Sequence, residues 1–89
     1  MARLTTKAVD AMRPGQSRRE VADDLAHGLY LIVQPSGSKS WAVRYRVDGK
    51  PAKITIGPYP AVSLAAARDN ALEVARTIAQ GVDPRKARK

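Results

Sequence analysis

The dipeptide Asp48-Gly49 stands between two stretches in which apolar and polar residues alternate, and it restricts the fold more than any other feature of the sequence. Asp-Gly is typical of a two-residue type I′ turn, which connects two antiparallel strands into a hairpin. We therefore expect SWAVRYRV (40–47) and PAKITIG (51–57) to be the two strands of a β-hairpin. The second strand is expected to end at the prolines that follow it, Pro58 and Pro60.

A two-residue turn also determines which residues of the hairpin face each other, because it makes Val47 the partner of Lys50. One face then holds the apolar side chains of both strands: Trp41 opposite Ile56, Val43 opposite Ile54, and Tyr45 opposite Ala52. On the other face Arg44 lies opposite Lys53. Like charges opposite each other destabilise a sheet by about 0.2–1 kcal/mol relative to a neutral pair. The pairing therefore favours a negatively charged partner over the alternative, an ordinary solvated face.

The preceding strand, LYLIVQ (29–34), is expected to pair with the hairpin through the loop PSGSK (35–39). A five-residue loop sets Tyr30 beside Arg44, with Ile32 exposed further along the same outer face, and this face carries no acid. Arginine can donate two hydrogen bonds to guanine, glutamine can pair with adenine, and a small sheet fits the DNA major groove. The candidate DNA-binding residues are Tyr30, Gln34, Lys39, Arg44, Arg46, Lys53 and Thr55.

From Ser63 onward the apolar residues recur with the period of a helix. Ser63 is a suitable N-cap and Gly81 fits the position after the helix end, which predicts a helix over 64–80. Its apolar stripe is Leu64, Ala67, Ala71, Leu72, Ala75, Ile78 and Ala79. A threonine-capped helix is expected at 6–13, and residues 18–24 are compatible with a short polar edge strand. The predicted fold class is α+β: a small three-stranded antiparallel sheet, with this extra edge strand in addition, packed on a C-terminal helix.

The 89 residues carry a formal net charge of +8, and the excess of Lys and Arg is concentrated in three segments. Residues 1–19 and 39–53 each have five basic residues against one acidic residue, and the final RKARK (85–89) adds four more. Such clustering favours a nucleic acid as the partner. A membrane surface is less favoured, because no basic helix carries the aromatic face that is typical of membrane-surface binding. We expect one domain over 1–84, with 85–89 as the start of a basic linker.

The residue types that catalysis or metal binding would need are scarce in this chain. It has no cysteine and a single histidine, His27, and it contains neither a P-loop nor another glycine-rich nucleotide motif. We therefore expect no catalysis by these residues, no metal and no cofactor. No apolar run is long enough to span a membrane and no signal segment is recognisable, which favours a cytoplasmic location.

Three segments taken together resemble the N-terminal arm-type DNA-binding domain of bacterial prophage and genomic-island integrases, which are tyrosine recombinases. They are GLYLIVQPSGSKSWAVRYRVDGK (28–50), IGPYPAVSLAAAR (56–68) and QGVDP (80–84). The opening LTTKAVDAMRPG (4–15) fits as well, so the resemblance covers almost the whole chain. The family more often has glycine-rich residues where this chain has DDLAHG (23–28), which leaves the conformation of 24–27 open.

The resemblance implies a sheet that enters the major groove of double-stranded DNA at arm-type sites, in a bacterial cytoplasmic protein that supports integration and excision of a prophage or genomic island. It also implies that the catalytic residues of a parent tyrosine recombinase lie beyond residue 89. The alternative is a protein-interaction module, in which Tyr30, Ile32 and the sheet edge dock another integrase subunit or an accessory DNA-bending or excision factor. RNA binding by a similar small sheet is a third hypothesis.

Overall fold

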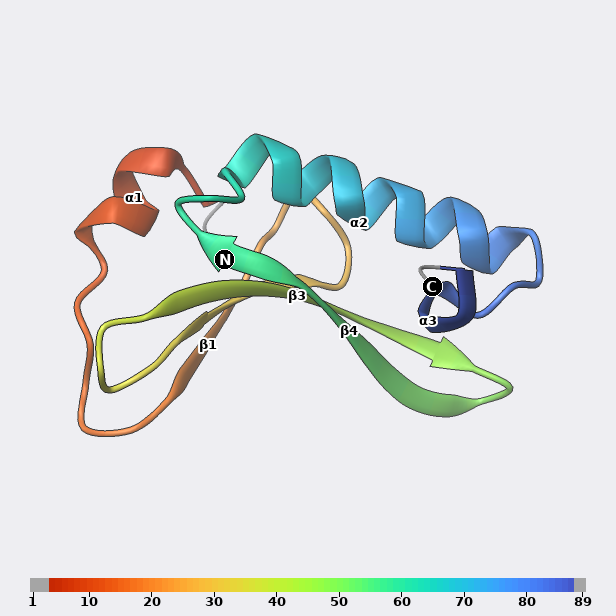
Figure 1. Cartoon of the computed structure of the whole chain (residues 1–89), viewed down its shortest axis with the longest axis horizontal. Helices are drawn as coiled ribbons and strands as arrows, with labels where there is room; N and C mark the ends of the chain where they lie inside the picture. Colours follow the sequence, from red (N-terminus) through yellow and green to blue (C-terminus); the bar gives the residue numbers. More distant parts are fainter. Residues whose placement is uncertain (1–3, 88–89) are drawn as a thin grey trace.

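The computed structural model describes residues 4–87 and shows one antiparallel sheet with helices on one side (Figure 1). The sheet has the strand order β1-β2-β3-β4, and α2 lies across one of its faces. The α+β fold class is therefore confirmed, and the extra edge strand is β1. The elements are α1 (Thr6–Ala11), β1 (Arg19–Ala22), β2 (Leu29–Val33), β3 (Lys39–Val47), β4 (Lys50–Tyr59), α2 (Leu64–Ala79) and α3 (Pro84–Ala87).

The turn between β3 and β4 has the predicted geometry, since Asp48 and Gly49 have φ angles of 52° and 78°. The predicted register holds from Val47, opposite Lys50, as far as Ala42, opposite Thr55. Beyond this point the prediction is wrong, because a β-bulge shifts the register and places Trp41 opposite Gly57 instead of Ile56. The prediction that prolines end the strand is wrong for Pro58, which lies within β4, and correct for Pro60, since β4 ends at Tyr59. As an edge strand, β4 tolerates a residue without an N–H group.

The predicted register between β2 and β3 is wrong by two residues. The Gln34 N–H donates to the Ser38 carbonyl over 2.9 Å, so the loop contains only the three residues 35–37. Gly37 makes this shorter loop feasible, because its φ of 97° is favourable only for glycine. As a result Tyr30 lies opposite Ala42 rather than opposite Arg44.

The core lies between the sheet and α2. It consists of Leu4, Val9, Leu29, Leu31, Val33, Trp41, Val43, Tyr45, Ile54, Leu64, Ala67, Ala71 and Val74. Trp41 is fully buried, and its indole N–H donates to the Val62 carbonyl over 2.8 Å. Ser63 caps α2 as predicted, by accepting a hydrogen bond from the Ala66 N–H over 3.1 Å.

The predicted apolar stripe of α2 is only partly correct. Val74 is buried although the sequence analysis did not include it, whereas Leu72 is 51% exposed, and Ala75 and Ala79 are also exposed. The buried residues Leu64, Ala67, Ala71 and Val74 follow one line along α2, and Ile78 at its end packs against the core. Leu72, Ala75 and Ala79 each lie one position beside this line and are therefore exposed.

Asp23 determines the conformation of residues 24–27, which the sequence left open. Its carboxylate accepts a hydrogen bond from the Ala26 N–H over 3.1 Å and forms an ion pair with Arg68 at 2.9 Å. The Arg68 guanidinium also donates to the Leu4 carbonyl over 2.7 Å. Burial by itself raises the pKa of Asp23, but the contacts with Arg68 and Ala26 outweigh it and lower the pKa to about 2. This buried ion pair connects the N-terminal segment, the loop before β2 and α2.

The chain after α2 turns back towards the β3–β4 hairpin. Residues 84–87 form α3, and Asp83 accepts hydrogen bonds from the Tyr45 hydroxyl at 3.1 Å and from the Arg85 N–H at 3.0 Å. Hydrogen bonds from Arg85 lower the pKa of Asp83 to about 2, and burial together with the bond to Asp83 raises the pKa of Tyr45. The predicted linker therefore begins as a helix held against the hairpin, and its residues 88–89 lie outside the described part of the chain.

Candidate nucleic-acid interface

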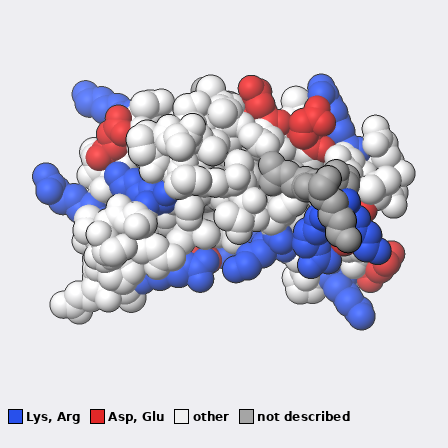
Figure 2. All heavy atoms as spheres, viewed as in Figure 1, with Lys and Arg blue, Asp and Glu red and all other residues white. Residues whose placement is uncertain are grey.

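The outer face of the sheet, on the side opposite α2, carries a group of basic side chains. Arg44 and Arg46 of β3 and Lys53 of β4 are exposed there, together with Thr55. Figure 2 shows Lys and Arg side chains along the lower edge of the molecule, where Figure 1 places the sheet. Arg44 lies directly opposite Lys53, as the hairpin register predicted. The structure therefore brings together four of the seven candidate DNA-binding residues on one surface.

Arg44 is not surrounded by cations alone, because β1 brings an acid to the same face. Glu20 forms an ion pair with Arg44 and a second one with Arg18 at 3.0 Å. The prediction of an outer face without acids is therefore wrong. The hydrogen bond to Glu20 raises the pKa of Arg44, but the Arg44 side chain remains 59% exposed. The ion pair is accessible to a competing anion.

The outer face also has an apolar part, which the Arg44 side chain partly covers. Tyr30, Ile32 and Ala42 form a small cluster of their own that is at most 7% exposed, so the prediction of an exposed isoleucine is wrong. The Arg44 guanidinium lies over the Tyr30 ring, 4.2 Å from its centroid. The Tyr30 hydroxyl is buried and has no hydrogen-bond partner within residues 4–87. Arg44 thus covers an aromatic ring whose polar group is unsatisfied.

The two remaining candidates lie apart from this group. The half-buried Gln34 follows β2 at the start of the loop, and its backbone closes the β2–β3 hairpin. Lys39 lies on the face that packs against the helices: its ammonium group donates to the Val9 carbonyl over 2.7 Å and is 6.0 Å from the centroid of the Tyr59 ring. Lys39 therefore holds α1 against the sheet.

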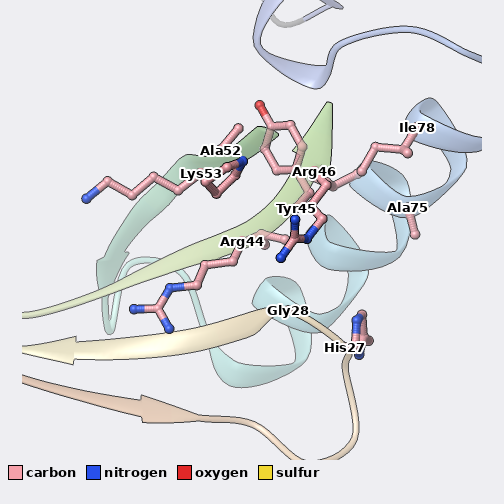
Figure 3. A pocket seen from close by; sticks show the side chains of 12 residues that line it. His27, Gly28, Arg44, Tyr45, Arg46, Ala52, Lys53, Ala75 and Ile78 are labelled. Carbon is pink, nitrogen blue, oxygen red and sulfur yellow. The ribbon is translucent and has the colours of Figure 1, made fainter. Parts of the chain in front are cut away.

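A groove runs beside the outer face, between the hairpin and the second half of α2. Figure 3 shows Arg44, Tyr45 and Arg46 on its strand side, Ala75 and Ile78 on its helix side, and Gly28 at one end. The loop approaches β3 closely at Gly28, whose carbonyl accepts from the Arg44 N–H over 2.8 Å. Gly28 has a φ of 83°, and a Cβ atom there would lie 2.5 Å from the Arg44 carbonyl oxygen, so only glycine fits.

Sequence reasoning missed Glu20, Asp83 and this groove. Glu20 could have been found only from the register of a four-residue edge strand, which the alternation of residues does not fix. Asp83 lies within the QGVDP motif that was noted for its resemblance, but nothing in the motif indicates Tyr45 as its partner. Within residues 4–87 no group of acidic or histidine side chains could hold a metal ion, and no helix is long and apolar enough to cross a membrane.

A sheet with an arginine-rich outer face and one covering helix is typical of a small nucleic-acid-binding module. The sequence profile of the Arm DNA-binding domain matches residues 4–89, and the chain belongs to this family. It is 42% identical over 86 residues both to the integrase of Shigella phage Sf6 and to the prophage integrase IntS of Escherichia coli K12. It is 35% identical over 89 residues to the integrase of Enterobacteria phage P4.

These alignments include 97–98% of the present chain but only 20–22% of each relative. The chain therefore spans about a fifth of the length of the curated relatives it matches. The resemblance that the sequence motifs indicated is confirmed, and the chain is a DNA-binding arm domain of the kind found in phage and prophage integrases.

Proposed function

We propose that this domain binds arm-type sites in duplex DNA by inserting the outer face of its sheet into the major groove. Within a tyrosine recombinase, this binding would support integration and excision of a prophage or genomic island. The observation that carries the proposal is the grouping of Arg44, Arg46 and Lys53 on one exposed face of a sheet. Arg46 and Lys53 form no ion pair within residues 4–87, so both charges are available to DNA. The family, an arm DNA-binding domain, and the three relatives given above, each named an integrase, support this assignment.

Arg44 is the side chain best suited to read a base. Its guanidinium can donate two parallel hydrogen bonds to the O6 and N7 atoms of guanine. To do so it must leave Glu20, and an ion pair this exposed contributes only about 0–1 kcal/mol. The exchange would also uncover the ring and hydroxyl of Tyr30, which could then contact the DNA. Arg46 and Lys53 would contact phosphates and so position the sheet in the groove.

The domain supplies binding and no bond-breaking step in this proposal. Integrase chemistry would be performed by residues outside this chain, which spans about a fifth of the length of the relatives it matches. A suicide attachment-site substrate should therefore remain intact with the 89-residue chain alone. Cleavage or joining by this chain would contradict the proposed division of roles.

The test is a fluorescence-anisotropy titration of the 89-residue chain with a labelled duplex from the attachment region of its own element. If about five phosphates are neutralised, the plot of log affinity against log salt should have a slope of roughly −4 to −5. Duplex RNA of the same sequence should bind more weakly, because the A-form major groove is too narrow for a sheet. Affinity that hardly changes with salt would refute the proposal and favour a protein-interaction module.

A further inference from the structure

The groove between the hairpin and α2 is large enough for several side chains of a partner. We call it the hairpin groove, and its open volume is about 870 Å³. It is lined by His27, Gly28, Val43, Arg44, Tyr45, Arg46, Pro51, Ala52, Lys53, Val74, Ala75 and Ile78. Its walls come from three places that are distant in sequence: the loop before β2, the hairpin and the second half of α2. The fold thus creates this surface where the hairpin diverges from the helix (Figure 1).

The helix side of the groove is apolar, and no other element of the described chain covers it. Ala75 is exposed, and Ile78, which is half-buried and packs against the edge of the core, lies beside it on the groove. Val74 forms part of the floor and also belongs to the core. An apolar strip of this kind favours contact with apolar groups of a partner, since their burial removes apolar surface from water.

The strand side of the groove is polar and basic. Because β2 begins at Leu29, which pairs with Val43, the β3 backbone beyond Arg44 has no neighbouring strand on its β2 side within residues 4–87. Arg44, Arg46 and Lys53 are among the lining residues of the groove, and none of the described residues that line it is acidic. A strand edge without a neighbour can pair with an extended peptide. The positive charge requires that such a peptide be acidic.

We propose that the hairpin groove binds a short, extended, acidic peptide of a partner protein, with apolar side chains directed onto α2. The carboxylates would meet Arg46 and Lys53, while leucine-like side chains would cover Ala75 and Ile78. DNA fits the groove less well, because its charged and hydrated phosphates gain nothing from lying against this apolar strip. The proposal adds a protein contact to the proposed DNA binding and does not depend on it. Because Arg44, Arg46 and Lys53 would serve both partners, peptide and DNA should compete.

The probe is a fluorescein-labelled peptide of eight residues in which glutamate and leucine alternate, so that an extended chain has one acidic and one apolar face. Two control peptides alternate glutamate with serine and lysine with leucine. The first peptide should bind more tightly than either control and should shift the backbone NMR signals of the groove residues. Equal binding of all three, or signals that move elsewhere, would overturn the proposal.

Two matched substitutions separate the groove from the rest of α2. Ala75→Asp places a negative charge on the exposed apolar wall and should weaken binding of the glutamate–leucine peptide by about tenfold or more. Ala65→Asp makes the same change at an exposed position near the start of the helix, outside the groove, and should leave the affinity within about twofold. Circular dichroism melts confirm that both variants remain folded. Equal peptide affinities of the two folded variants would refute the assignment.

DNA serves as the second arm of the experiment. Ala75→Asp lies on α2 and not on the outer face of the sheet, so it should reduce peptide affinity much more than DNA affinity. If the groove signals respond to duplex DNA and not to the peptide, the groove belongs to the DNA interface and the proposal is wrong. If the peptide binds while DNA does not, the groove proposal holds and the proposed DNA function fails. If the free chain self-associates through these residues, the occupant is a second copy and the peptide proposal also fails.

Discussion

The molecule contains two arginine–carboxylate pairs that use the same chemistry in opposite environments. Asp23 is 6% exposed and its partner Arg68 reaches it from α2, whereas Glu20 and Arg44 meet on the exposed outer face of the sheet. Burial makes the first pair costly to break, because the Asp23 carboxylate would remain without its partner away from water. Exposure makes the second pair easy to exchange, because water or DNA can replace the lost partner. The first pair stabilises the fold, and the second can act in binding.

The largest expected effect comes from removing one partner of the buried pair. Arg68→Ala leaves the Asp23 carboxylate without its guanidinium and the Leu4 carbonyl without a donor. The free energy of unfolding should fall by about 3–5 kcal/mol in a urea titration. Arg76→Ala is the control, since Arg76 pairs with Glu73 on the exposed surface of α2 and should cost less than about 1 kcal/mol. Similar losses for both variants would mean that burial does not distinguish the pairs.

Acid provides a second way to break the buried pair without any change of side-chain size. The pKa of Asp23 falls from its ordinary 3.8 to about 2 in the folded protein, so the unfolded state binds the proton more readily. The resulting stabilisation, about 2 kcal/mol, is complete above pH 4 and is lost as the pH falls towards 2. Asp23→Asn should be less stable than the parent at neutral pH, and its stability should vary less over this interval. Urea titrations at several pH values would measure both curves.

Parallel curves for the parent and Asp23→Asn would contradict the assignment of this pH dependence to Asp23. Asp83 also has a pKa of about 2, so it adds to the acid sensitivity of both proteins. Because Asp83 is present in both proteins, the difference between the curves isolates Asp23.

Breaking the exposed pair by a substitution of Arg44 should change DNA affinity rather than stability. Arg44→Ala is expected to weaken specific binding by about 1–3 kcal/mol and to relax the preference at one base position. Its melting temperature should stay close to that of the parent, because the side chain is 59% exposed. Competition titrations and thermal melts of this variant, with Arg76→Ala as the control, measure the two properties separately. Normal binding by Arg44→Ala, or lost binding through unfolding, would remove Arg44 from the interface.

The two pairs also show what the sequence can predict. The two turn residues were sufficient to predict the β3–β4 hairpin, because Asp48-Gly49 fixes both the turn type and the pairing of Arg44 with Lys53. The β2–β3 register failed because loops of three and five residues both keep the apolar residues on one face. Only the position of Gly37 favours the shorter loop, and its significance depends on a backbone angle that the sequence does not give.

The ion-pair partners of Arg68 and Arg44 could not be predicted from local sequence patterns, for a different reason. Arg68 meets Asp23 across 45 residues of sequence, and Arg44 meets Glu20 across 24. Such contacts depend on how the edge strand and the helix are placed against the sheet, which alternation and helical period leave undetermined. The hairpin groove depends likewise on the angle between the hairpin and α2. The sequence therefore predicted the elements and the cationic face but not the neighbours that set the charge balance on that face.

The smallest expected effect comes from a substitution of Glu20, the acidic member of the exposed pair. Glu20→Gln removes the charge that holds Arg44 and Arg18 but keeps a side chain of nearly the same size. If Glu20 competes with DNA for Arg44, affinity for the attachment-site duplex should rise by about 0–1 kcal/mol, opposite in sign to Arg44→Ala. The gain should shrink at high salt, where exposed charges are screened.

Stability should hardly change in Glu20→Gln, because the Glu20 side chain is one-third exposed and its ion pairs are at the surface. The measurement is an anisotropy titration of both proteins at low and moderate salt, with thermal melts as the folding control. A loss of affinity in the folded variant would reverse the interpretation: Glu20 would then accept a hydrogen bond from a base such as cytosine, or hold Arg44 in the orientation that reads guanine. A gain in affinity would establish that the exposed ion pair restrains Arg44 until DNA replaces the carboxylate.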